Sequence, residues 1–172
     1  QNVVISDDGN NIAVKTSNYI YFFSKDGNQP LWKRQCETGA EGPSGGSGWV
    51  DISADGKHIA GGCRESLSLF SESGSLAWTY KDNIGIYAAS ISADGEYLAV
   101  GTSFSDELIF FSKKSNKPLW KYQATSDVHG LSVSSDGNLV AAVQTGASGL
   151  VLNFVKGTLF SLEKRYAISS GE

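Results

Sequence analysis

The sequence predicts an all-β protein built from four copies of one unit, and three observations lead to this prediction. The chain has 172 residues, of which 40% are hydrophobic and 11% aromatic. Two short motifs recur together four times along its whole length. The segments between them are rich in β-branched and aromatic residues, and no window has the periodicity of an amphipathic helix. Repetition of strand-forming segments indicates a fold made of similar β-sheets.

The first motif is a hydrophobic residue and a serine followed by x-Asp-Gly. It begins at Ile5, Ile52, Ile91 and Val133. Successive copies are therefore 47, 39 and 42 residues apart. The second motif ends in an aromatic residue, which is Trp32, Trp78, Trp120 or Phe160. This residue follows the start of the first motif by 27, 26, 29 and 27 residues. Because both motifs keep their spacing four times, each repeat is expected to be one structural unit.

Each repeat is expected to contain four strands, a to d. Strand a ends at the first motif, whose Asp-Gly pair predicts a two-residue hairpin turn with positive φ at both central positions. Strand b follows, as in residues 12–14. Strand c is aromatic, as in residues 19–23. A polar turn then leads to strand d with its tryptophan. The four units within the single module 1–172 are predicted to span 1–37, 49–82, 87–124 and 129–166.

Repeats of about 40–45 residues with four strands each are typical of β-propeller blades. The order of Ser-x-Asp-Gly, a hydrophobic-Ala strand, an aromatic strand and a tryptophan resembles WD40-like and PQQ-like propeller repeats. Residues 73–78, Ser-Gly-Ser-Leu-Ala-Trp, are most similar to the tryptophan-docking element of the PQQ-type blade. The resemblance implies that the aromatic residue of the second motif packs between neighbouring blades. The interblade residues implied are Trp32, Trp78, Trp120 and Phe160.

The four blades admit three arrangements. They form a closed four-bladed ring, half of a larger ring completed by a second chain, or part of a longer propeller chain. Half a ring leaves hydrophobic interblade faces uncovered, which favours assembly with further blades.

One segment, 38–48, departs from the repeat: Trp32 precedes Ile52 by 20 residues, where the other two spacings are 13. Its Gly- and Ser-rich composition is that of a linker or surface loop.

Composition excludes several classes of function. The net charge is −4, with no block of basic residues, which disfavours binding of nucleic acid or anionic lipid. No apolar run reaches the roughly 20 residues needed to span a bilayer. The aspartates of the Asp-Gly pairs are explained by turn chemistry. The cysteines and histidines lack the spacing of a zinc site, so no metal or cofactor is expected.

Candidate binding residues are those that interrupt the repeat, because the fold does not require them. They are expected on the face of the d-to-a and b-to-c connections, where a protein or small ligand would bind. The candidates are Trp49, Asp51, Arg64, Glu65, Asp127 and His129. The other histidine, His58, is expected at an ordinary surface position.

Cys36 and Cys63 are expected at the same end of adjacent blades. They form either a disulfide or two small buried thiols. A disulfide would indicate an oxidising compartment.

The function expected is a non-catalytic binding or interaction platform in an extracellular, periplasmic or cell-surface setting. No catalytic motif of nucleophile and base is present. Resemblance to PQQ-like blades leaves open a segment of a quinoprotein oxidoreductase. A structural subunit that assembles through its open blade edges is a third alternative.

Overall fold

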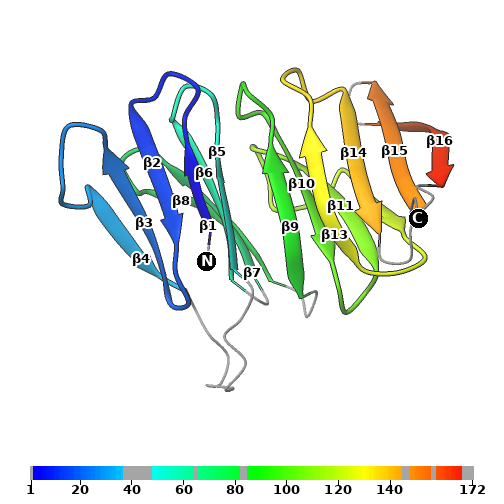
Figure 1. The fold of residues 1–172 in the computed structure, drawn as a ribbon, viewed down its shortest axis with the longest axis horizontal. Coiled ribbons are helices and arrows are strands. Elements are labelled where there is room, and N and C mark those ends of the chain that lie inside the picture. The colour runs from blue at the N-terminus through cyan, green and yellow to red at the C-terminus, as the bar shows by residue number, and fades with distance from the viewer. Residues whose placement is uncertain are drawn as a thin grey trace, which may run out of the picture.

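The structure is a computed structural model that describes residues 2–36, 48–63, 66–81, 85–144, 148–155 and 158–167. Every regular element in these ranges is a β-strand (Figure 1). No helix long and apolar enough to cross a membrane occurs in the described part of the chain.

The strands form four antiparallel sheets, each with its strands in chain order. The first sheet comprises β1 (Asn2–Ile5), β2 (Asn11–Lys15), β3 (Tyr19–Ser24) and β4 (Trp32–Gln35). The second comprises β5 (Gly48–Ile52), β6 (His58–Cys63), β7 (Ser66–Ser71) and β8 (Leu76–Lys81). The third comprises β9 (Ile86–Ile91), β10 (Tyr97–Thr102), β11 (Glu107–Ser112) and β12 (Trp120–Gln123). The fourth comprises β13 (Val128–Val133), β14 (Leu139–Gln144), β15 (Ser148–Val155) and β16 (Thr158–Ala167). Each sheet thus holds one sequence repeat.

The turn between the first two strands is built from the Ser-x-Asp-Gly motif. In the first repeat the Ser6 hydroxyl donates to Asp8 Oδ1 at 2.6 Å, and the Gly9 amide donates to the Ser6 carbonyl at 2.8 Å. The prediction of positive φ at both Asp and Gly was wrong. Only the glycine has it, with φ of 68° at Gly9, because a four-residue turn starting at the serine needs the left-handed conformation at its last position alone.

The hydrophobic core lies between consecutive sheets. Strands alternate their side chains between two faces, so each inner sheet packs on both neighbours. Between the first and second sheets, the core includes Ala13, Phe22 and Ile59, each 0% exposed. Similar clusters fill the space between the second and third sheets and between the third and fourth. The core is therefore a series of three interfaces rather than one centre.

The first strands of successive sheets are joined by side chains that accept backbone N–H groups of the next sheet. Asn2 Oδ1 accepts from the Val50 amide at 3.1 Å, and Asp51 Oδ2 accepts from the Ile91 amide at 3.0 Å. Ser90 Oγ accepts from Val133 N–H at 3.3 Å. These bonds fix the register of each sheet against the next.

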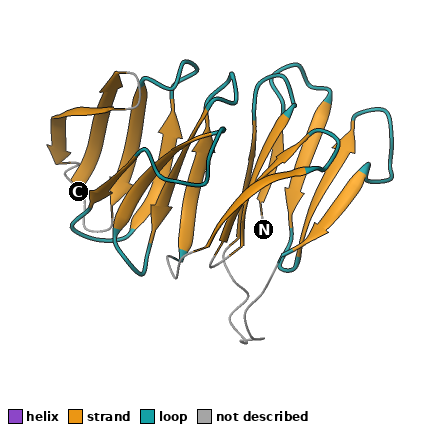
Figure 2. Ribbon diagram, turned by 180° about the vertical axis from the view of Figure 1, so that it is seen from behind, coloured by secondary structure: helices purple, strands orange, loops and turns teal. Residues whose placement is uncertain are grey.

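The four sheets stand in a row, with the first and fourth at opposite ends (Figures 1 and 2). The first strand of each sheet packs on the first strand of the next sheet: β1 on β5, β5 on β9 and β9 on β13. Of the arrangements that the sequence allowed, the closed four-bladed ring is not the one observed. The described sheets form an open series.

Candidate functional site

A group of polar and aromatic side chains lies at the end of the third and fourth sheets where β9, β11 and β13 begin. Tyr87 is the second residue of β9, and Phe104 and Asp106 belong to the connection from β10 to β11. Asp127 and His129 flank the first residue of β13. These five residues are called the loop-face cluster.

Four members of the cluster contact one another across the two sheets, and Phe104 lies on the same connection as one of them, Asp106. The rings of Tyr87 and His129 are 4.6 Å apart between centroids, with an interplanar angle of 35°. His129 Nε2 lies 3.8 Å from Asp127 Oδ2. Burial raises the pKa of Asp106, and a hydrogen bond with the Asp127 carboxyl and its charge raise it further.

The connection that carries Phe104 is held in place by hydrogen bonds at both ends. Ser103 Oγ donates to the Gly85 carbonyl at 3.1 Å. The Asp106 carbonyl accepts from the Ala124 amide at 2.7 Å. Asp106 itself has φ of 51°, a conformation that aspartate tolerates better than most residues. Phe104 remains 58% exposed and Tyr87 40% exposed. The cluster is thus a fixed surface with two exposed aromatic rings.

The structure brings only part of the predicted set together. Asp127 and His129 meet in the cluster. Trp49 instead lies partly buried against the core between the second and third sheets. Arg64 and Glu65 lie outside the described residues, as do residues 38–47 of the predicted insertion.

The placement of Asp51 with the loop face was wrong. Asp51 lines a cavity of about 300 Å³ together with Asp7 and Ala54, which belong to the turns at the opposite end of the sheets. Besides the Ile91 amide, its carboxylate accepts from its neighbour Ile52 at 2.9 Å. Burial raises the pKa of Asp51. Its visible role is to join two sheets.

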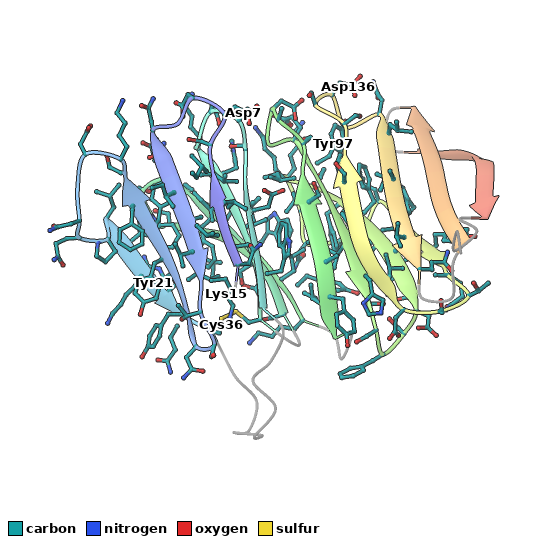
Figure 3. All side chains as sticks on the ribbon, viewed as in Figure 1. Asp7, Lys15, Tyr21, Cys36, Tyr97 and Asp136 are labelled. Atoms are coloured by element: carbon teal, nitrogen blue, oxygen red, sulfur yellow. A yellow bond between two sulfur atoms is a disulfide. The ribbon has the colours of Figure 1, made fainter. Side chains whose placement is uncertain are left out.

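Asp7 lies at the upper edge of the molecule in Figure 3, together with Tyr97 and Asp136.

In the part of the chain that the structure describes, no three His, Cys, Asp or Glu side chains are grouped to hold a metal ion.

Cys36 and Cys63 form a disulfide, with the sulfur atoms 2.07 Å apart and the Cα atoms 5.6 Å apart. Cys36 follows β4 and Cys63 ends β6, so the bond joins the first two sheets at the end away from the Asp-Gly turns (Figure 3). Of the two states that the sequence left open, the structure has the bridged one.

The tryptophans lie between sheets and have structural roles. Trp32 Nε1 donates to the Glu72 carbonyl of the second sheet, and Trp78 Nε1 donates to the Lys113 carbonyl of the third, both at 2.8 Å. Trp120 stacks on Phe110 with centroids 5.0 Å apart. Phe160 lies in β16, where side chains fall outside the description.

His58 is not at an ordinary surface position. It packs beneath the turn of the next sheet, where a Cβ at Gly95 would lie 2.6 Å from His58 Nδ1. Burial lowers the pKa of His58. It is a contact between sheets, like Tyr97 one repeat later, which packs beneath Gly137 in the same way.

Sequence reasoning missed Tyr87, Phe104 and Asp106. One signal was available: Tyr87 and His129 each stand four residues before the first motif of their repeat. Equivalent positions in adjacent repeats face each other when sheets pack in register. Phe104 and Asp106 carried no such signal, because the b-to-c connection varies freely.

Comparison with known proteins gives the fold alone. No family model matches the sequence, and no curated protein matches it. Among solved structures, the chain is similar to the β-propeller domain of Cps50 (Swd1) from Myceliophteria thermophila, with a TM-score of 0.66 and 12% identity. The match covers 84% of this chain and 49% of that one, so the chain spans about half the length of the propeller it matches. Four consecutive four-stranded antiparallel sheets with this likeness establish the fold: the repeats are β-propeller blades.

Proposed function

We propose that the protein is a non-catalytic propeller module that binds a protein partner through the loop-face cluster. The observation that carries the proposal is the exposure of two aromatic rings, Phe104 at 58% and Tyr87 at 40%, on the same loop face as the carboxyl groups of Asp106 and Asp127. Aromatic residues are enriched in protein interfaces and supply many of their strongest contacts. The fold does not need either ring at these positions.

The chemistry of the cluster favours a segment that carries Lys or Arg. Carboxylates form charge-assisted hydrogen bonds with these cations, and aromatic faces attract them. Asp106 and Asp127 supply the first group, and Tyr87 and Phe104 the second. The net charge of −4 acts in the same direction at long range. An open surface of this kind suits an extended peptide better than a small molecule, which usually binds in an enclosed pocket.

An oxidising setting forms part of the proposal. The Cys36–Cys63 disulfide supports it, since such bonds persist in extracellular and periplasmic proteins and are rare in the cytosol. We propose a secreted, periplasmic or cell-surface location.

The test is titration of the isotope-labelled protein with an unstructured peptide of alternating Arg and Gly, followed by NMR. A matched Glu-Gly peptide controls for non-specific contact. The Arg-Gly peptide is expected to shift the amide signals around Tyr87, Phe104 and His129, while the Glu-Gly peptide leaves them unchanged.

Two variants, Tyr87→Ala and Phe104→Ala, are each expected to weaken peptide binding about tenfold, the size of a typical hot-spot loss. Leu76→Ala removes another exposed apolar side chain, 56% exposed on β8, and is expected to leave binding unchanged. Shifts confined to the end of the Asp-Gly turns, or equal shifts with both peptides, would contradict the proposal.

A further inference from the structure

The first sheet has one apolar face that no other described sheet covers. The register pairs Val3 with Val14 and Ile5 with Ile12, and Ile12 in turn with Phe23. Residues paired directly across strands share a face. Val3 is 62% exposed and Ile5 61% exposed. This surface, together with Tyr21, is called the receiving face; Tyr21 lies in the end sheet in Figure 3.

The same positions are covered in the sheets that follow. The residue equivalent to Ile5 is Ile52, 7% exposed, in the second sheet and Ile91, 6% exposed, in the third. Phe23 pairs with Ile12 as Phe70 pairs with Ile59 and Phe111 with Leu98. A face of this composition is therefore normally buried by the sheet before it.

In the second and third sheets, a tryptophan of the preceding sheet packs on the equivalent face. Trp32 lies 5.6 Å from Phe70 between ring centroids, and Trp78 lies 5.7 Å from Phe111. Phe23 occupies the same register position and has no preceding sheet in the described chain. The receiving face has the composition of a docking surface for another blade.

The fourth sheet has the complementary open face. Its strand β14 exposes Leu139 to 38% and Val143 to 46%, and Ala141 between them is also exposed. The residues equivalent to Ala141 in the first three sheets are Ala13, Ala60 and Ala99, each 0% exposed against the next sheet. This surface of β14 is called the presenting face.

We infer that the receiving face of one chain binds the presenting face of a second copy. In all three interfaces within the chain, a presenting face meets a receiving face, and neither kind meets its own kind. A second copy supplies both missing partners at once. Two copies related by a two-fold axis would close one ring of eight blades, a number within the range of known propellers. This inference rests on the fold and the open faces, and not on the loop-face cluster.

The test is the mass of the 172-residue chain in solution, by light scattering and sedimentation from about 1 to 100 μM, a range that covers micromolar association. Twice the chain mass of 18.3 kDa is expected. Ile5→Glu places a charge on the receiving face, and Val143→Glu places one on the presenting face. Each variant alone is expected to be monomeric where the parent is dimeric.

Mixing the two variants distinguishes this geometry from others. In a mixed pair, one interface carries both charges and the other carries none, so partial dimerisation is expected to return. Leu76→Glu charges an exposed site on neither face and is expected to leave the dimer intact. Val3→Glu repeats the receiving-face test if Ile5→Glu disturbs folding as judged by circular dichroism.

Three results would overturn the inference. A parent chain that stays monomeric at the highest concentration would leave other blades as the occupant. A dimer lost in Ile5→Glu but kept in Val143→Glu would indicate that two receiving faces pair. A mixture that remains monomeric would show that the two faces do not meet.

Discussion

Replacement of Trp32 tests whether one indole holds the first two blades together. Trp32 is 9% exposed and stacks on Phe22 with centroids 5.2 Å apart. Its Nε1 donates to the carbonyl of Glu72, 40 residues away. Gly74, which has φ of +77°, lies so close that an added Cβ would be 2.8 Å from Trp32 Cγ. The stacking on Phe22 lies within the first sheet, whereas the hydrogen bond, the close approach of Gly74 and a 5.6 Å ring contact with Phe70 act across the interface with the second sheet.

The expected losses differ between variants. Trp32→Ala removes a buried aromatic ring and is expected to lower the free energy of unfolding by about 4 kcal/mol. Trp32→Phe keeps a ring for stacking but removes the N–H donor, for an expected loss of about 1 kcal/mol. Gly74→Ala combines backbone strain of about 1–2 kcal/mol with overpacking against the indole of about 1–3 kcal/mol. In the Trp32→Ala background only the backbone strain of Gly74→Ala remains.

The assay is equilibrium urea unfolding under non-reducing conditions, followed by far-ultraviolet circular dichroism, for the parent, the two single alanine variants and the double variant. A coupling energy of at least about 1 kcal/mol between Trp32→Ala and Gly74→Ala is expected, because the clash needs both groups. Additive losses, or a loss below about 1 kcal/mol for Trp32→Ala, would refute the role of the indole as an interblade contact.

Three further predictions concern the disulfide and the carboxylates. The double variant Cys36→Ser/Cys63→Ser should lower the free energy of unfolding by about 3–4 kcal/mol, since the bond closes a loop with a sequence separation of 27; denaturant unfolding measures this, and an unchanged midpoint contradicts it. The hydroxyl of the preceding serine lowers the pKa of Asp8 and of Asp136 below 3.8, so their contribution to stability is present above that pH and is lost as pH falls through the lowered pKa. In the variants Asp8→Asn and Asp136→Asn, the free energy of unfolding should therefore fall less steeply with falling pH than in the parent. An unchanged slope would contradict a stabilising role for the serine–aspartate hydrogen bonds of the turns. Burial raises the pKa of Asp51 above 3.8, so the contribution of Asp51 to stability falls as pH rises through the raised pKa. The free energy of unfolding of Asp51→Asn relative to the parent should therefore rise with pH in that range. A difference in free energy that does not change with pH would contradict this prediction.

Much of the fold follows from local patterns. The Ser-x-Asp-Gly motif contains both its hydroxyl donor and its carboxylate acceptor, so the turn forms from four adjacent residues. The hydrophobic alternation of strands and the fixed distance to the tryptophan repeat with the blade, because each blade meets the next in the same way. For Trp32 and Trp78, the interblade position expected from the repeat is the one observed.

The candidate site was less accessible to sequence reasoning. Asp127 and His129 are two residues apart, and their proximity was visible in the chain. Tyr87 is 42 residues from His129, and only the packing of the third sheet on the fourth brings the rings to 4.6 Å. Asp51 failed as a surface candidate because its partner is a backbone amide 40 residues away, and a backbone donor has no signature in sequence.

The sequence by itself determined the unit of this protein: four strands, a serine-anchored turn and an aromatic residue for the neighbouring blade. These depend on interactions within about 40 residues, and they recur because the unit recurs. Only the tertiary structure decided how the units are arranged. It gave an open series with a receiving face on the first sheet and a presenting face on the fourth, since the angle between sheets depends on packing between side chains far apart in sequence. The same residue pattern, Ile5 or Ile52, is 61% exposed at the end of the series and 7% exposed inside it, because exposure depends on what lies opposite and not on the residue.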